Sequence, residues 1–295
     1  MRVVKVNASA MGASHKRSKN PKCQDANLVK TLPDHTIVAC IADGHGSEKC
    51  RFSDRGARFA VEAFYELVRK YYSNADGNHD SMMQHLKKSE TTKFVQLFHT
   101  IWKRKIKNSY DQIRKAYTDL SQIKEVNPEL YGTTFIGMII ASDFVYGLQI
   151  GDGDMAFVDK RGYQVVIRPD KFLGVETYSM SEDEPWRHAK SYLQEVEFDS
   201  NIPFMYILTT DGFANSFKDD EQYQISCVDY FNTICKYGQK AVQTNLEEWL
   251  SQTSEEGCGD DITLVAVGGI EDEDDNETDD EGDVSATDNG DDADI

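Results

Sequence analysis

The sequence lacks a long hydrophobic run. No stretch of about 18 apolar residues occurs in its 295 positions, which argues against a transmembrane helix. The first twenty residues, MRVVKVNASAMGASHKRSKN, contain no apolar core of the kind that marks a secretory signal peptide. These absences predict a cytoplasmic protein that has no membrane partner.

The cysteines lack the spacing of a metal or redox motif. None of the six forms a CxxC pair, which predicts reduced and mostly buried thiols. Cys40 and Cys50 flank an Asp-Gly-His-Gly segment, so a zinc pair stays open as an alternative. No cysteine is followed by an arginine six residues later, which excludes the phosphate loop of cysteine phosphatases. GxxxxGK[ST] and GxSxG are also missing, so neither a P-loop enzyme nor a nucleophile-elbow hydrolase is expected.

Basic residues are missing from the end of the chain. Residues 271–295 contain fourteen Asp or Glu and no Lys or Arg, so they account for most of the net charge of −19 and leave −5 elsewhere. A segment of this composition cannot bury enough apolar surface to fold, which predicts a catalytic domain over 1–270 and a disordered acidic tail over 271–295. The overall acidity argues against a nucleic-acid partner. Weak calcium buffering by the tail is a remote alternative, because the tail lacks the fixed Gly and bidentate Glu of a calcium loop.

The remaining residues predict strands and helices in separate blocks. Strands are expected at 3–10, 26–31, 37–42, 204–209 and 262–267, and helices at 53–72, 223–237 and 239–251, with Ser53 as an N-cap. The runs FIGMII, FVYGLQI, MAFVD and YQVVI predict a β-meander, and polar residues 169–200 predict a loop region. This segregation favours an α+β fold with antiparallel sheets.

Residues 81–126 predict a helix-rich segment with an excess of positive charge. Residues 84–125 carry ten Lys or Arg against four Asp or Glu. Two alternatives stay open, namely the solvated faces of a helical pair and a surface that docks anions.

Acidic residues follow or precede four of the apolar strands. Asp43, Asp152 and Asp211 come directly after predicted strands, and Asp260 precedes the last one. Each Asp-Gly pair alone fits a hairpin turn, and the GDGD segment lacks the later residues of a calcium loop. In antiparallel sheets, however, the end of one strand lies beside the start of its neighbour, so these acids can gather on one rim.

A cluster of this kind predicts a phosphate-ester hydrolase. Carboxylate oxygens beside glycines suit hard cations such as magnesium or manganese. Two ions bridged by one carboxylate would polarise a water and hold a phosphoryl oxygen. His45, beside Asp43, could protonate the leaving oxygen.

The order of short motifs resembles the metal-dependent protein phosphatase 2C family from about residue 8 to 268. The motifs are CQDA, IADGHG, YGTT, LQIGDGD, ILTTDGF and GDDITLVAV, and CQDA is closest to the bacterial-type variants. The resemblance implies a four-layer α-β-β-α sandwich of two antiparallel sheets flanked by helices. It also implies phosphoserine or phosphothreonine protein substrates, two Mg²⁺ or Mn²⁺ ions and a weaker third ion.

The resemblance also assigns roles to individual residues. Asp43 is expected to bridge the two ions and Gly44 to offer its carbonyl, while Asp211 and Asp260 complete the acidic shell. Asp25 is expected to hold a metal-bound water, Asp152 to recruit the third ion, and His45 to act as general acid. The segment Gly132-Thr133-Thr134 is expected to be structural.

Two positions depart from the family pattern. Gln24 replaces a glutamate, and a neutral amide there could still orient a metal-bound water while removing one charge. The phosphate-binding arginine of the family falls at Asn20, which cannot hold a phosphate bidentately. Arg17, Lys16 or Lys22 could substitute from the same loop, or could be no more than exposed loop charges.

We expect a monomer that acts opposite a serine/threonine kinase. Two alternatives remain, a pseudophosphatase that only binds its partners and a hydrolase of small phosphate esters. Because Asp43, Asp211 and Asp260 are all present, the sequence favours catalysis.

Overall fold

The computed structural model describes residues 1–19, 21–169, 177–198 and 202–271, and these build two antiparallel sheets of five strands each. The first sheet has the order β1-β10-β9-β6-β7, formed by Arg2–Ala10, Ile262–Ile270, Phe204–Thr209, Asp154–Asp159 and Gly162–Ile167. The second has the order β2-β3-β4-β5-β8, formed by Ala26–Thr31, Ile37–Ala42, Phe135–Ile140, Phe144–Ile150 and Lys190–Glu195.

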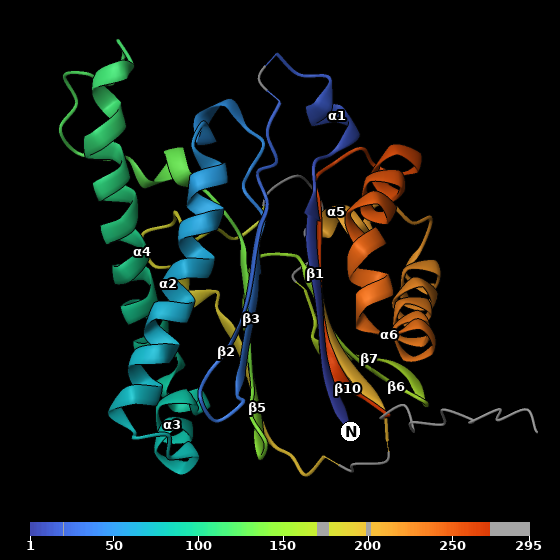
Figure 1. Ribbon diagram of the computed structural model, residues 1–295. Helices are drawn as coiled ribbons and strands as arrows, with labels where there is room; N and C mark the ends of the chain where they lie inside the picture. Colours follow the sequence, from blue (N-terminus) through green and yellow to red (C-terminus); the bar gives the residue numbers. More distant parts are fainter. Residues whose placement is uncertain (20, 170–176, 199–201, 272–295) are drawn as a thin grey trace, which may run out of the picture.

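Helices cover the outer face of each sheet, which gives four layers (Figure 1). The second sheet is covered by α2 (Ser53–Asn74), α3 (His79–Leu86) and α4 (Thr91–Ile113). The first sheet is covered by α6 (Asp220–Glu256), with the short α5 (Asp211–Ala214) beside it, while α1 (Ala13–Lys16) lies at the end of β1. Short 3₁₀ turns occupy Glu48–Cys50, Lys88–Glu90, Arg114–Ala116, Pro128–Tyr131 and Pro185–Arg187. The expected four-layer α-β-β-α sandwich is confirmed.

Strand β3 shows why an uninterrupted apolar run is needed at the centre of the sandwich. All six of its residues are buried. Val38, Cys40 and Ala42 join the core beneath the helices, whereas the alternate residues, beginning with Ile37, pack between the two sheets. Since side chains alternate along a strand, a strand buried on both faces has no polar positions.

Helix α6 consists of two segments separated by a kink at Gly238. This residue has φ 76° and ψ 168°, a conformation that glycine adopts without a Cβ clash. The sequence prediction of two helices, ending at Tyr237 and beginning again at Gln239, is therefore confirmed, and both segments pack on the first sheet.

Three local predictions are wrong. The four strands from residue 135 do not form one meander, because β4 and β5 pair in the second sheet while β6 and β7 pair in the first. The expected loop over 169–200 contains edge strand β8, whose half-exposed side chains hide the apolar pattern of a strand. Ser53 is the first helical residue of α2 and not its cap, which is Phe52.

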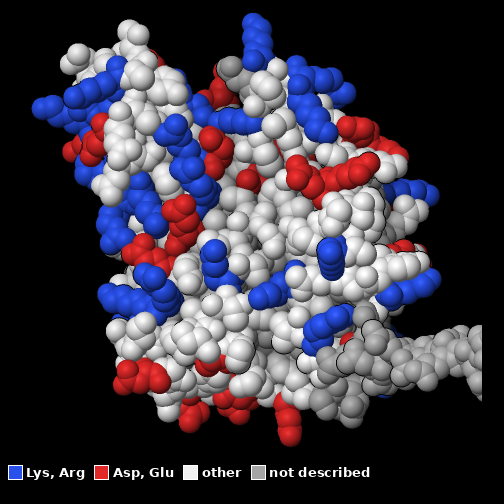
Figure 2. Space-filling model, in the orientation of Figure 1, with Lys and Arg blue, Asp and Glu red and all other residues white. Residues whose placement is uncertain are grey.

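The positive stretch at 84–125 is mostly the solvated surface of α4 and its flanks. Five of its ten cations lie within ion-pair distance of a carboxylate, as in the pairs Arg104–Glu66 and Lys105–Glu62 between α4 and α2. Figure 2 shows acidic side chains among the basic ones over this layer. This pattern favours solvated helix faces over an anion-docking surface.

Other expectations concern the cysteines, the membrane and the tail. The six cysteines are free thiols. Cys40 faces the backbone carbonyls of Leu28 and Val61 while Cys50 contacts Ser47, so Cys40 and Cys50 do not form a zinc pair.

In the described parts of the chain, no helix is long and apolar enough to cross a membrane. The predicted tail lies outside the described residues apart from Glu271, so the division at Ile270 stays a prediction.

Candidate active site

The strand ends gather acidic residues on one rim, at the end of the sandwich where α1 and α5 lie (Figure 1). Asp43 follows β3, Asp152 follows β5, Asp211 follows β9 and Asp260 lies just before β10. The sheet registers place the end of β9 beside the start of β10 and the end of β3 beside the start of β4. With Asp25, which immediately precedes β2, these residues form a cluster that we call the acidic rim.

The backbone of Asp43 is held by the YGTT segment. Its carbonyl accepts the Thr133 hydroxyl at 2.7 Å and the Thr134 N–H at 2.8 Å, and its own N–H donates to the Thr134 hydroxyl at 3.2 Å. Gly44 and Thr133 form an isolated antiparallel bridge. A Cβ on Gly44 would lie 2.5 Å from the Gln24 carbonyl oxygen, so only glycine fits. The structural role expected for Gly132-Thr133-Thr134 agrees with these contacts.

The carboxylates of the rim disfavour one another's charge. Burial raises the pKa of Asp25, and Asp261 raises it further, while hydrogen bonds from Thr263 and Thr210 oppose the shift. Burial also raises the pKa of Asp43, with Asp25 and Asp211 adding to the effect. The pKa of Asp260 is raised too, again mainly by burial. Acids held together in this way are relieved by protons or by cations.

Asp152 and Asp25 add two details to this picture. Burial and the nearby Asp211 raise the pKa of Asp152 to about 6. Asp25 is 8% exposed, and its Oδ2 accepts the Thr210 hydroxyl at 2.8 Å, whereas its Oδ1 is buried with no hydrogen-bond partner. A buried carboxylate oxygen without a donor suits a cation.

The donor chemistry of the rim fits hard divalent ions. Its side chains offer only oxygen, and Gly44 adds a backbone carbonyl next to Asp43. Within the described ranges, no three Asp, Glu, His or Cys side chains already converge as a closed metal cage. The rim therefore has the composition of a metal site without a closed arrangement of its side chains.

His45 lies next to the rim, half buried in the DGHG loop. Its backbone N–H donates to the Gly132 carbonyl at 3.1 Å, which orients the loop. Burial lowers the pKa of His45, and the negative charge of Asp211 partly opposes this shift. A lowered pKa makes the imidazolium a stronger acid, which suits proton donation to a leaving oxygen.

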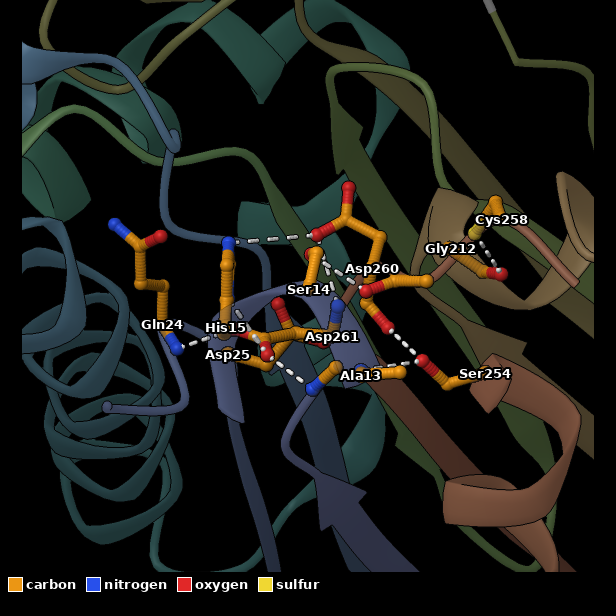
Figure 3. Close-up of polar contacts among 12 residues, drawn as sticks. Ala13, Ser14, His15, Gln24, Asp25, Gly212, Ser254, Cys258, Asp260 and Asp261 are labelled. Atoms are coloured by element: carbon orange, nitrogen blue, oxygen red, sulfur yellow. Dashed lines mark hydrogen bonds and ion pairs between the residues drawn. The ribbon is translucent and has the colours of Figure 1, made fainter. Parts of the chain in front are cut away.

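Asp261 is an important residue that the sequence analysis did not single out. It is 3% exposed, and its Oδ1 accepts the backbone N–H of Gly12 at 2.7 Å while its Oδ2 accepts the backbone N–H of Gln24 at 2.6 Å. His15 Nδ1 lies 2.9 Å from the same Oδ1, and His15 Nε2 points toward Asp260 at 4.0 Å (Figure 3). Asp261 therefore ties the loops on both sides of α1 to the start of β10. Its position beside Asp260 was the one hint in the sequence.

Further hydrogen bonds hold the backbone of the turn that carries Asp260 (Figure 3). The Ser254 hydroxyl donates to the Asp260 carbonyl at 2.7 Å and accepts the Ala13 N–H at 3.1 Å. The Ser14 N–H and hydroxyl both donate to the Gly259 carbonyl, at 2.9 and 2.7 Å. The segment that contains α1 thus anchors the turn that carries Asp260.

The three candidate phosphate-binding residues have different surroundings. Lys16 extends toward Ser251 and Glu255 on α6, at 3.1 and 3.3 Å. Lys22 bonds to Asp54 at 2.6 Å and to the Arg51 carbonyl. Arg17 is exposed, and although its backbone N–H donates to the Ser14 carbonyl, its side chain makes no hydrogen bond or ion pair to another described residue, so this side chain is the candidate that needs to break no contact. Asn20 lies outside the described residues.

Comparisons with known proteins agree with this fold. The family model described as protein phosphatase 2C matches residues 11–251. The S. agalactiae serine/threonine phosphatase superposes with a TM-score of 0.56 at 15% identity, covering 92% of this chain and 100% of that one. PppA, a regulatory component of the type VI secretion system (T6SS) in Pseudomonas aeruginosa, gives 0.54 at 13% identity, with 90% and 97% covered.

A third structure was solved with metal. The catalytic domain of the serine/threonine protein phosphatase PstP in complex with 2 manganese ions gives a TM-score of 0.52 at 13% identity, covering 92% of this chain and all of that domain. At these identities the likeness concerns the fold. No curated protein sequence matches the chain.

The two antiparallel sheets with helices on their outer faces have the architecture of the serine/threonine phosphatases on which they superpose. The family model matches most of the chain, so this protein belongs to the protein phosphatase 2C family and is a phosphoprotein phosphatase.

Proposed function

We propose that this chain is a metal-dependent serine/threonine protein phosphatase whose acidic rim holds two Mg²⁺ or Mn²⁺ ions. The observation that carries the proposal is the gathering of carboxylates from separate strand ends, where burial and mutual repulsion raise the pKa values of Asp25, Asp43 and Asp260. When bound, such ions supply Lewis acidity, which activates water and neutralises phosphoryl charge.

Each residue of the rim has a role in this proposal. Asp43 would hold both ions through its carboxylate and Gly44 would offer its carbonyl, and the YGTT segment fixes the backbone of Asp43 for this role. Asp211 and Asp260 would complete the acidic shell, Asp25 would orient a water through its Oδ1, which has no hydrogen-bond partner, and Asp152 would hold a weaker third ion.

The reaction is hydrolysis of a phosphate monoester. The oxygen of water attacks phosphorus and gives up one proton to solvent, the bond from phosphorus to the serine or threonine oxygen breaks, and the leaving alkoxide takes a proton from the general acid, which solvent then recharges; the products are hydrogen phosphate and the free hydroxyl group. His45 donates that proton, since a dianionic phosphate and Asp211 favour its charged form while burial keeps it acidic. Of the three candidate cations, Lys16, Lys22 and Arg17, the Arg17 side chain would hold the phosphate oxygens without first breaking a contact to another described residue.

Phosphorylated proteins are made by serine/threonine kinases, so we propose a kinase counterpart. We also propose that the chain acts as a monomer, because both helical layers already cover the sheets on their outer faces (Figure 1).

A phosphopeptide hydrolysis assay with and without Mn²⁺ tests the proposal. We expect phosphate release from phosphoserine and phosphothreonine peptides with Mn²⁺ and none after chelation. Absence of turnover with every divalent ion would favour a binding module, and turnover of small phosphate esters alone would favour a small-molecule hydrolase.

A further inference from the structure

Gln24 is buried behind the DGHG loop and bonds to two acceptors. Its side-chain nitrogen donates to the His45 carbonyl at 3.1 Å and to the Ser53 hydroxyl at the start of α2. The residue is 8% exposed, and Ser53 is fully buried. The amide therefore joins three elements, namely the loop before β2, the loop that carries His45, and α2.

The orientation of this amide is fixed by its surroundings. A backbone carbonyl only accepts hydrogen bonds, so the nitrogen and not the oxygen of Gln24 must face His45. Both N–H groups are thus directed to the backbone and to Ser53, and neither is left to hold a water at the acidic rim.

A second glutamine makes the same kind of contact at another part of the rim. Gln149, 1% exposed on β5, donates from its side-chain nitrogen to the carbonyls of Gly151 at 3.2 Å and Gly153 at 2.6 Å. These carbonyls flank Asp152, where the chain crosses from one sheet to the other. Two separate loops of the rim are therefore held by buried glutamine amides.

Electrostatics explains why amides occupy these positions. A lysine or arginine would pair with the rim carboxylates and compete with a cation. A glutamate would add repulsion to acids whose pKa values are already raised, and an ionised carboxylate cannot donate to a carbonyl. Glutamine supplies two donors without charge.

We propose that Gln24 is a positioning residue that holds His45, the proton donor, through its backbone carbonyl. This inference rests on the proposed function, and it differs from treating Gln24 as a weakened substitute for a glutamate beside the metal ions. For Gln24→Glu, the positioning role predicts lower phosphopeptide turnover, whereas the substitute-ligand account predicts higher turnover and tighter Mn²⁺ binding.

The first experiment compares Gln24→Met with wild type, because methionine keeps the side-chain length and removes both donors. With Mn²⁺, we expect kcat for a phosphoserine peptide to fall about 10- to 100-fold, the scale reported for misplacement by about 1 Å. We expect the fall to be less than about threefold for an aryl phosphate, whose leaving oxygen needs no proton. KM and the Mn²⁺ affinity by calorimetry should stay within about twofold of the wild-type values.

A double variant separates positioning from a general structural role. If Gln24 acts through His45, Gln24→Met combined with His45→Gln should lose no more phosphopeptide activity than His45→Gln alone. Multiplicative losses would overturn the proposal.

Gln24→Glu is the second variant, because glutamate has the same number of heavy atoms and the same shape as glutamine. It tests the proposal even if Gln24→Met does not fold. We expect lower phosphopeptide turnover, because the carboxylate faces the His45 carbonyl. Higher turnover together with tighter Mn²⁺ binding would overturn the proposal.

Gln243→Met is the matched control. The Gln243 amide also donates to a backbone carbonyl, that of Asn7 at 3.0 Å, but it bridges α6 and β1 on the outer face of the other sheet. We expect this variant to show no difference between the two substrates.

Amide hydrogen exchange keeps the inference separate from the proposed function. If wild type hydrolyses neither substrate, the proposed function fails, but exchange still reports whether Gln24 holds the loop. Faster exchange at residues 44–46 in Gln24→Met supports the positioning role, and unchanged exchange overturns it.

Discussion

Asp43, at the end of β3, is buried beside Asp211, the first residue of α5, and burial together with the negative charges of Asp25 and Asp211 and a hydrogen bond from the Asp211 carboxyl group raises the pKa of Asp43. Two residues separated by 168 positions in the chain thus share one electrostatic environment. A proton or a cation at this position would relieve the repulsion between the two carboxylates.

Asp211→Asn should therefore keep the fold and lose activity. The substitution removes a charge without changing volume, so we expect at least a 100-fold lower phosphopeptide turnover. Calorimetry should show weaker Mn²⁺ binding. Asp229→Asn, on the exposed face of α6, is the control and should bind Mn²⁺ as wild type does. Unchanged metal affinity in Asp211→Asn would contradict the assignment of Asp211 as a ligand.

His45→Gln should affect poor leaving groups most. A serine alkoxide needs a proton as it leaves, whereas an activated aryl oxide does not. We expect phosphopeptide turnover to fall about 100-fold and aryl phosphate turnover much less. Parallel kinetics on the two substrates measure this difference. Equal losses would mean that His45 only maintains the DGHG loop.

Protein stability should depend on pH through His79, which lies at the start of α3 between two aspartates. Its Nε2 lies 2.8 Å from Asp34 Oδ2, and its Nδ1 contacts Asp143. Burial alone would lower the pKa of His79, but the hydrogen bonds to Asp34 and Asp143 outweigh it and raise the pKa. Burial would raise the pKa of Asp34, yet its bonds from His79 and Thr36 lower it.

The direction of the effect follows from these shifts. The stabilisation from charged His79 is complete below about pH 6.5 and is lost as pH rises through the raised pKa of the folded state. The stabilisation from Asp34 is complete above about pH 4 and is lost as pH falls through its lowered pKa. Because the groups are partly exposed, each pair contributes about 1 kcal/mol or less.

Urea unfolding between pH 5 and 8 measures this contribution. Wild type should lose stability relative to His79→Asn as pH rises above about 6.5. His85→Asn, which removes another histidine of α3, is the control and should show the same pH dependence of stability as wild type. A constant difference between wild type and His79→Asn across this range would contradict the prediction.

Removing residues 271–295 should lower the apparent KM for phosphopeptides at low salt, if the tail competes with substrate. Strand β10 begins at the rim and ends at Ile270, so the tail starts about 30 Å from the rim at 3.3 Å per residue. A flexible segment of about 25 residues has a root-mean-square reach of about 25–30 Å. Tethering then gives the polyanion a millimolar-scale effective concentration.

The measurement is KM at several salt concentrations for full-length and truncated protein. We expect the difference to shrink as salt screens the tail. A tail of equal length with Asn and Gln in place of the acids should behave like the truncation. Equal KM values at low ionic strength would leave the tail as a solubilising segment.

Much of the fold follows from local patterns in the sequence. The run Ile37–Ala42 is apolar at every position because both faces of β3 are buried, and the interruption at Gly238 divides α6 where only glycine tolerates the backbone. The acids at strand ends were also visible, because antiparallel pairing brings such ends to one edge. Side-chain period and turn chemistry act over a few residues, so they can be read directly.

Tertiary structure alone decided how these elements meet. The polar edge strand β8 is defined by its pairing with β5. After β5 the chain passes from one sheet to the other, which separates two hairpins that the sequence pattern alone presents as one meander. Asp261 reaches Gly12 and Gln24, and Gln24 reaches His45 and Ser53, over separations of 21 to 249 residues. A hydrogen bond depends on distance and direction between groups that only packing brings together, so the sequence by itself indicated the acids of the rim but not the amides that hold their loops.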